Sequence, residues 1–390
     1  MTPDSPRETA KAAGDRAAVR VQAGRDAPPS PEHVPPPAPA QQVDQESVGA
    51  KVPPGAKGVN LALQGGGSHG AFAWGVLDRL LEDRRIHIEG VSAASAGASN
   101  ATVLAYGLTV GGKEGARKAL SEFWELIAKK GASSPLQASW IDKALNNRTL
   151  SFSPSFAIFD FLSRMFSPYE INPLNYNPLR DTITSIVDFE VLRQRCAVKL
   201  FLSATNVRTG KIRIFRDREI TPEVVLASGC LPFLFQTIEI DGEGYWDGGY
   251  MGNPALYPLI YSAQSRDVII VHINPLHRDN IPKTAHEILD RVNEISFNSS
   301  LMREMRAVAY VTSLIDNGEL DSKTHHRMLI HSIRNEGYMK ALSVWSKLYT
   351  ERSFLHELRE VGRETADRWL AENFDALNNR STVDLKPLFL

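Results

Sequence analysis

Three short segments of the sequence place polar residues that can do chemistry beside glycine and alanine. Residues 65–70 read GGGSHG, Ser95 lies within AASAG, and Asp247 is followed by two glycines. A serine hydroxyl is a weak nucleophile that must lose its proton to an adjacent base, and a carboxylate can be that base. Taken alone, Asp-Gly-Gly is a common turn signal. If the fold brings the three segments together, they predict hydrolysis of an acyl group by a serine nucleophile.

The glycine-rich segment connects a predicted strand to a predicted helix. An apolar run at 58–64 precedes it, and apolar residues at helical spacing follow it from Phe72 to Leu81. Its backbone N–H groups are unshielded by side chains and lie where a helix dipole favours negative charge. Such a loop can stabilise the oxyanion of an acyl intermediate or hold a phosphate. Gly65, Gly67 and Gly70 also match the GxGxxG pattern of dinucleotide-binding proteins.

Ser95 lies in a tight turn between a second apolar run at 86–91 and a further predicted helix. A nucleophile elbow needs small residues two positions before and two positions after the serine, and Ala93 and Gly97 meet that need. The usual pattern has glycine at the first of these positions. A serine at this place can also simply cap the helix. Ser92 is a weaker candidate because it precedes the turn and lacks the trailing glycine.

Composition excludes several classes of function. The chain has 390 residues, a formal net charge of -1 and 43% hydrophobic residues, so no overall charge attracts it to nucleic acid or to an anionic bilayer. Cys196 and Cys230 are the only cysteines and cannot form a disulfide framework. The N-terminus lacks the apolar core of a secretory signal, and no apolar stretch is long enough to span a membrane. We expect a cytoplasmic protein that meets membranes only peripherally.

The chain divides into three predicted regions. Residues 1–55 hold about half of its prolines and are expected to form a disordered Pro/Ala-rich tail. Residues 56–275 alternate strand and helix signals, which favours parallel strands, and residues 276–390 are mostly helical in pattern. Within the middle region, residues 131–180 mix aromatic residues, Met and Pro without clear periodicity and are a candidate lid or acyl groove. The phenylalanines expected to line it are Phe156, Phe159 and Phe161. The runs expected to form strands are 58–64, 86–91, 198–204, 212–215 and 268–273.

The motifs resemble the three signature blocks of patatin-like phospholipases. They are LALQGGGSHGAFAWGVL, GVSAASAGASNA and ASGCLPFLF with the later IDGEGYWDGGYMGNP, in the family's order, between about Val59 and about Ile273. The resemblance implies an α/β fold of three layers, α/β/α, with a mostly parallel central sheet and a helical C-terminal extension. It implies a Ser–Asp dyad in which Ser95 attacks the acyl carbonyl and Asp247 moves the proton. The implied substrate is a lipid ester, as for a phospholipase A, and no metal or organic cofactor is implied.

The resemblance also assigns roles to small residues around the dyad. The oxyanion hole is implied to consist of backbone amides of Gly65, Gly66, Gly67 and Ser68. The supporting small residues are Gly70, Ala93, Gly97, Gly248 and Gly249. Two positions depart from the family pattern: Ala93 replaces the first glycine of the elbow, and His69 stands where the family usually carries Arg or Lys. His69 is therefore a candidate modulator of the loop and of its response to pH.

Three alternatives remain open from the sequence. A Ser95–Asp247–His272 triad has the chain order of an α/β-hydrolase, but that fold needs several strands before its elbow, and His272 lies inside an apolar strand. A non-catalytic lipid- or partner-binding protein would account for the two departures from the family pattern. A dinucleotide site would need Glu89 at the end of the second strand, but the strand runs on into the serine turn.

Overall fold

The structure is a computed structural model that describes residues 52–132, 166–321 and 325–389. The tail predicted at 1–55 lies almost wholly outside these ranges. So does most of the predicted lid at 131–180, including Phe156, Phe159 and Phe161. The described residues belong to one compact unit, Ser47–Leu390.

One sheet forms the centre of this unit, with the strand order β5-β6-β3-β2-β1-β7-β8 and with β4 paired to β3. The strands are β1 Lys57–Leu63, β2 Ile86–Ala93, β3 Lys199–Asn206, β4 Ile212–Arg216, β5 Ile238–Ile240, β6 Glu243–Asp247, β7 Asp267–Val271 and β8 Leu329–Ile333. Strands β3, β2, β1, β7 and β8 are parallel to their neighbours in this series, whereas β4, β5 and β6 pair antiparallel. The predicted mostly parallel sheet is therefore confirmed, and each of the five predicted strands is present.

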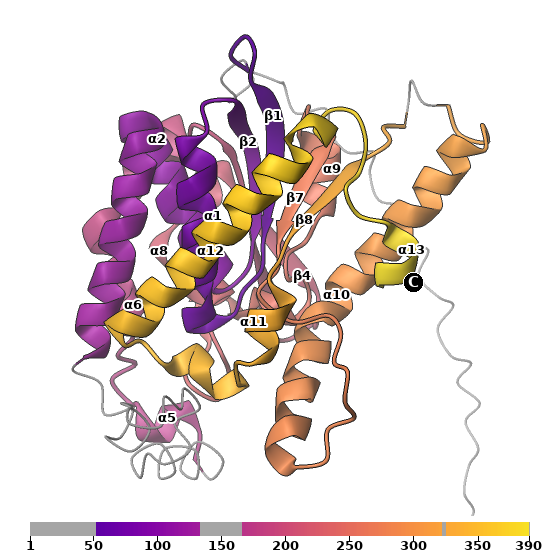
Figure 1. Cartoon of the computed structure of the whole chain (residues 1–390). Helices are drawn as coiled ribbons and strands as arrows, with labels where there is room; N and C mark the ends of the chain where they lie inside the picture. Colours follow the sequence, from indigo (N-terminus) through magenta and orange to yellow (C-terminus); the bar gives the residue numbers. More distant parts are fainter. Residues whose placement is uncertain (1–51, 133–165, 322–324, 390) are drawn as a thin grey trace, which may run out of the picture. The chain divides into compact units, whose positions relative to one another are not determined.

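Helices cover both faces of the sheet (Figure 1). The α-helices are α1 Gly70–Glu82, α2 Ala96–Gly131, α5 Pro168–Ile171, α6 Pro178–Ile186, α7 Phe189–Arg195, α8 Pro222–Ser228, α9 Tyr257–Ser262, α10 Ala285–Asp316, α11 Glu336–Lys340, α12 Arg352–Asn373 and α13 Leu385–Phe389. Short 3-10 helices are η1 Gly67–His69, η2 Asp217–Glu219, η3 Gly248–Tyr250, η4 Val344–Leu348 and η5 Phe374–Ala376. None of the helices in the described ranges is long and apolar enough to cross a membrane.

The two faces of the sheet bury two separate hydrophobic clusters because side chains alternate along a strand. Ile269 and Val271 of β7 belong to the cluster that includes residues of α1, α2, α8 and α12. Val268 and Ile270 belong to the cluster that includes residues of α9, α10 and α13. This arrangement is the predicted three-layer α/β/α fold.

The apolar pattern after the serine turn predicts a helix that runs to about Tyr106, whereas α2 extends to Gly131. The helix kinks where Gly111 and Gly112 leave helical backbone angles, and it continues because buried residues such as Leu120 and Phe123 resume the apolar spacing.

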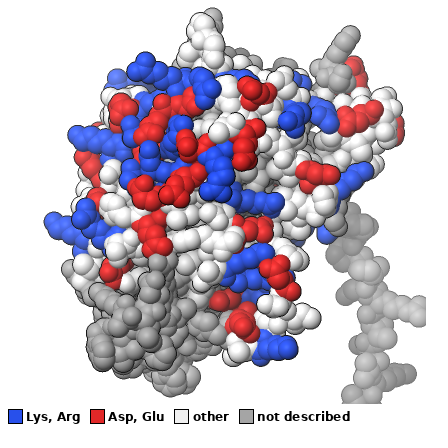
Figure 2. Space-filling model, in the orientation of Figure 1, with Lys and Arg blue, Asp and Glu red and all other residues white. Residues whose placement is uncertain are grey.

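The C-terminal region is mostly helical, as expected, and it is built into the layers. It also contributes β8, a strand that was not predicted and that extends the sheet beside β7. Helix α12 packs closely on α1, because a Cβ atom on Gly75 would lie 1.9 Å from the carbonyl oxygen of Arg359. Asp78 of α1 receives hydrogen bonds at 2.7 Å from both Arg117 and Arg359. Basic and acidic side chains accordingly interleave on the face over α12 (Figure 2).

Candidate active site

Ser95 occupies a tight turn between β2, which ends at Ala93, and α2, which begins at Ala96. Its backbone angles are φ 54° and ψ −127°. A residue other than glycine at such angles costs about 1–3 kcal/mol and persists only where the surroundings hold it. Here the Ser95 amide donates to the carbonyl oxygen of Ser228 at 3.1 Å and to its hydroxyl at 3.0 Å. The turn that the sequence predicts at Ser95 is present, and its backbone is strained.

The two small residues that flank this turn differ in how strictly their size is required. A Cβ atom on Gly97 would lie 2.5 Å from the carbonyl oxygen of Leu63, so only glycine fits there. Ala93 is fully buried within the hydrophobic cluster under α1 and α2, and its carbonyl oxygen accepts a hydrogen bond from Ser203 at 3.2 Å. The methyl group that replaces the usual glycine hydrogen is therefore part of the core packing.

Asp247 ends β6, opposite Ala204 of the antiparallel strand β3. Its Oδ1 atom accepts a hydrogen bond from the Gly249 amide at 2.7 Å, and its Oδ2 atom has no hydrogen-bond partner among the described residues. Complete burial raises the pKa of this carboxyl to about 6, and the nearby Ser95 hydroxyl opposes part of that rise. The Ser95 hydroxyl is therefore close enough to influence the Asp247 carboxyl, and the pKa of that carboxyl is suited to accepting a proton near neutral pH.

The glycine loop lies directly beside the serine turn. A Cβ atom on Gly65 would lie 2.4 Å from the Cβ atom of Ser95. The Gly65 amide already donates to Oδ1 of Asn253 at 2.6 Å, so it is not free to bind an oxyanion. The amides of Gly67 and Ser68 belong to the first turn of η1, where N–H groups have no partner within the helix. Gly65 therefore differs from the other three residues implied to form the oxyanion hole. Its lack of a side chain allows the loop to lie against Ser95.

A layer of buried amide side chains that the sequence motifs do not predict supports this loop. Oε1 of Gln64 accepts hydrogen bonds from the amides of Ile273 and Asn274, at 2.9 and 3.0 Å. Nδ2 of Asn274 donates to the carbonyl oxygen of Gly65 at 3.0 Å, and Nε2 of Gln64 donates to Asn298 at 3.0 Å. A polar Gln64 directly after an apolar strand was the one local signal of this layer, because its partners come from distant parts of the chain.

His69 is buried, and its Nε2 atom lies 2.7 Å from the hydroxyl oxygen of Ser346 in η4. Burial, together with the nearby charge of Lys347, lowers the pKa of His69 to about 3. The imidazole is therefore neutral at physiological pH. His69 links the loop to the C-terminal region and does not supply a positive charge.

Comparison with known proteins adds to this geometry. The family model for patatin-like phospholipases matches residues 61–260. The chain belongs to this family. Similar solved structures include VipD from Legionella pneumophila, at 17% identity and a TM-score of 0.37, with 82% of this chain and 67% of that chain covered. They also include the ExoU–SpcU complex from the type III secretion system of Pseudomonas aeruginosa, at 15% identity and a TM-score of 0.35. That match covers 83% of this chain and 53% of the other, so the chain spans about half its length. No curated protein matched the sequence.

The remaining supporting glycines of this family member lie where any side chain would collide with a neighbour. A Cβ atom on Gly248 would lie 2.1 Å from the carbonyl oxygen of Ser203, and one on Gly249 would lie 2.5 Å from the Phe297 ring. A Cβ atom on Gly70 would approach that of Ala96 to 2.9 Å. These contacts bring the loop that carries Asp247, the glycine loop and the start of α2 close to their neighbours.

Two other candidates lie outside this arrangement. The Ser92 hydroxyl donates to the carbonyl oxygen of Ala255, so it is already bound within the core. His272 is buried and stacks against Phe389, and neither ring nitrogen has a hydrogen-bond partner in the part of the chain that the structure describes. A triad histidine needs hydrogen bonds to both serine and carboxylate, so the alternative triad is not formed. Within the described ranges, no three His, Cys, Asp or Glu side chains come together in a group that could hold a metal ion.

Proposed function

We propose that this patatin-like phospholipase hydrolyses carboxylic esters of lipids through a dyad of Ser95 and Asp247. Membership in the family supports a lipid acyl hydrolase in general. The observation that carries the proposal is the buried Asp247 carboxyl beside the Ser95 hydroxyl, with its Oδ2 atom unpartnered among the described residues. General-base catalysis is most effective when the pKa of the base lies near the pH at which the enzyme works.

The reaction begins when Ser95 Oγ attacks the acyl carbonyl carbon and its proton passes to Oδ2 of Asp247. The carbonyl oxygen becomes an oxyanion, which the amides of Gly66, Gly67 and Ser68 stabilise. The tetrahedral intermediate collapses, the bond to the leaving oxygen breaks, and Asp247 returns the proton so that an alcohol leaves. Water then attacks the acyl-serine while Asp247 accepts its proton. Transfer of that proton back to Ser95 Oγ releases the carboxylic acid.

The substrate class is a phospholipid or a related acyl ester, and the chain's own residues carry each proton in this sequence without a cofactor. Such substrates reside in bilayers and micelles, so the enzyme meets them at a membrane surface from the aqueous side. The described exposed apolar residues include Phe166, Tyr169, Leu174 and Phe233, but their exposure alone does not define a membrane contact.

A panel of phospholipids and neutral acyl esters, tested with wild type, Ser95→Ala and Asp247→Asn, examines this proposal. We expect wild type to release fatty acid and each variant to lose about 10²–10⁴ in rate. A fluorophosphonate probe should label Ser95 in wild type, since only an activated serine reacts. Vesicle binding by a wild-type protein whose Ser95 stays unlabelled would instead indicate a non-catalytic lipid-binding protein.

A further inference from the structure

A lysine of the C-terminal region reaches the catalytic loop. Lys347 lies in η4, and its carbonyl oxygen would be 2.3 Å from a Cβ atom on Gly67, which has a φ of +56°. The preceding residue, Ser346, contacts His69 at the other end of η1. The backbone of η4 therefore rests directly on the glycine loop.

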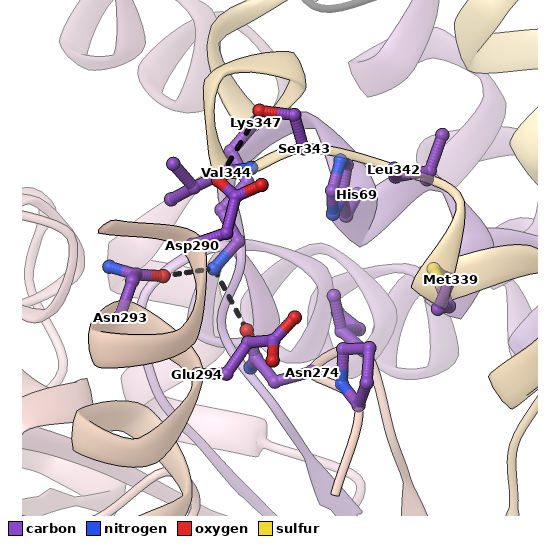
Figure 3. Close-up of a pocket in the computed structure, with 12 residues that line it drawn as sticks. His69, Asn274, Asp290, Asn293, Glu294, Met339, Leu342, Ser343, Val344 and Lys347 are labelled. Atoms are coloured by element: carbon purple, nitrogen blue, oxygen red, sulfur yellow. Dashed lines mark hydrogen bonds between the residues drawn. The ribbon is translucent and has the colours of Figure 1, made fainter. Parts of the chain in front are cut away.

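The Lys347 ammonium is bound mainly by neutral groups. Its Nζ atom donates to Oδ1 of Asn274 at 2.8 Å and to Oδ1 of Asn293 at 2.6 Å (Figure 3). It also lies 5.2 Å from the centre of the Phe297 ring, within the range of a cation–π interaction. Among the described residues Lys347 forms no ion pair with a carboxylate, so its charge is not neutralised by direct contact.

Two chains of contacts lead from this ammonium to the two halves of the dyad. Asn274, which receives one Lys347 hydrogen bond, donates to the carbonyl oxygen of Gly65, and Gly65 lies against Ser95. Phe297 lies against Gly249, whose amide binds Asp247. Loss of the ammonium would release both chains of contacts at the point where they join.

Asp247 is one of three carboxylates whose charges act on Lys347, after Glu294 and Asp290. Lys347 lines a small cavity of about 10 Å³, and Asp290 and Glu294 of α10 line it too (Figure 3). This volume is close to the least that holds a water molecule. Glu294 is paired with Arg278 and Arg291. Asp290 accepts a hydrogen bond from the Val344 amide at 2.9 Å.

The electrostatic effects at this site are mutual. Burial lowers the pKa of Lys347 to about 8, while Glu294, Asp290 and Asp247 oppose that change. Lys347 in turn lowers the pKa of Asp247. The neighbouring imidazole of His69 is neutral and does not compete with Lys347 as a source of positive charge.

We propose that Lys347 is a positioning residue of this site, which holds the glycine loop and the Asp247 loop together and brings its positive charge close to the base. The part of this inference that concerns catalysis rests on the proposed function. Its positioning role can be tested without activity.

The first test compares fluorophosphonate labelling of Ser95 across pH 5–9 in wild type, Lys347→Met and Lys347→Arg. Methionine keeps the length of the side chain but removes its charge. We expect the acidic limb of the labelling rate in Lys347→Met to move up by about 0.5–1 pH unit, and the rate at pH 7 to fall about tenfold. Lys347→Arg should keep the acidic limb of wild type because it keeps the charge.

The matched control is Lys340→Met, because Lys340 belongs to the same region but pairs with Asp279 and Glu336 away from the loop. It should label like wild type. Identical acidic limbs in wild type and Lys347→Met would overturn the electrostatic part of the inference.

The second test measures backbone hydrogen exchange in peptides that cover residues 64–70 and, for reference, the packed helices α1 and α12. We expect exchange at 64–70 to become about tenfold faster in Lys347→Met, with the rest of α1 and α12 unchanged and with Lys340→Met like wild type. If wild type neither hydrolyses lipid nor labels at Ser95, the proposed function fails, and exchange alone decides the positioning role. Unchanged exchange at 64–70 in Lys347→Met would overturn that role.

Discussion

Gly249 donates its backbone N–H to Oδ1 of Asp247 at 2.7 Å, and this bond fixes the carboxyl by one oxygen only. The other oxygen, Oδ2, has no hydrogen-bond partner among the described residues. A base that is anchored at one oxygen and open at the other can receive a proton without losing its support. This unequal binding distinguishes Asp247 from a carboxylate whose hydrogen-bonding capacity is used for structure, such as Asp78.

The pH dependence of turnover should follow the ionisation of Asp247. Because the base must be unprotonated and its pKa is raised to about 6, we expect kcat/KM to rise through about pH 6 and to level above it. Hydrolysis of a soluble short-chain ester between pH 4.5 and 8 would measure this limb. A rate that had already levelled by pH 4.5 would mean that a different group, or an Asp247 with an ordinary pKa, controls the reaction.

Ionisation of the buried Asp247 carboxyl should lower the stability of the protein as the pH rises from about 4 to about 6. Its folded-state pKa is raised from 3.8 to about 6, so the folded state holds this proton more tightly than the unfolded state does. The stabilisation is fully present below about pH 3.8 and is lost progressively as the pH rises from there through about 6. We expect Asp247→Asn to gain about 2 kcal/mol relative to wild type between pH 4.5 and pH 8. Urea unfolding at both pH values would measure this gain, and a pH-independent difference would contradict it.

Strain at Ser95 predicts a difference between two variants that both remove the hydroxyl. Ser95→Gly relieves the positive φ of 54°, whereas Ser95→Ala keeps it. After allowance for the greater freedom of glycine in the unfolded chain, we expect Ser95→Gly to be more stable by about 1 kcal/mol. Thermal or urea unfolding gives the comparison directly. Equal stability would show that the turn holds an alanine or serine without strain.

Gly67 should tolerate no side chain, because both its backbone angle and its contact with Lys347 exclude one. Gly210 is a matched control, with a φ of +65° and no atom within 4 Å of an added Cβ. We expect Gly67→Ala to lose about 2–4 kcal/mol and at least about tenfold in kcat/KM. Gly210→Ala should lose only about 1 kcal/mol and keep its activity. Similar losses in both variants would mean that the backbone angle, and not the contact with η4, decides the cost.

His272 should be dispensable for catalysis. Its unpartnered ring nitrogens are buried in an apolar setting, which costs stability that an apolar side chain of similar size would not. We expect His272→Leu to fold at least as stably as wild type and to keep its turnover within about twofold. A folded His272→Leu protein without esterase turnover would instead revive the triad.

Local patterns were sufficient for the parts of the site in which neighbouring residues in sequence also meet in space. The order of β1, the glycine loop and α1 could be predicted, because an apolar run, three glycines and residues at helical spacing follow one another along the chain. Strand β8 could not, because Leu329–Ile333 carries a histidine whose Nε2 atom lies 2.8 Å from Asp267 on the neighbouring strand. Lys347 was missed for the same reason, since its role depends on contacts with Gly67 and Asn274 that no local pattern records.

The position of β7 affects how long a fragment of this chain must be to fold. The family match ends at residue 260, yet β1 is bordered on one side by β7, which begins at Asp267. A fragment cut at the end of the match would leave the strand that leads into the glycine loop with a bare edge, open to pairing with other chains. A fragment that keeps β1 paired must therefore reach at least through β7, and it must also include η4 and α12 to keep their contacts with Gly67 and Gly75.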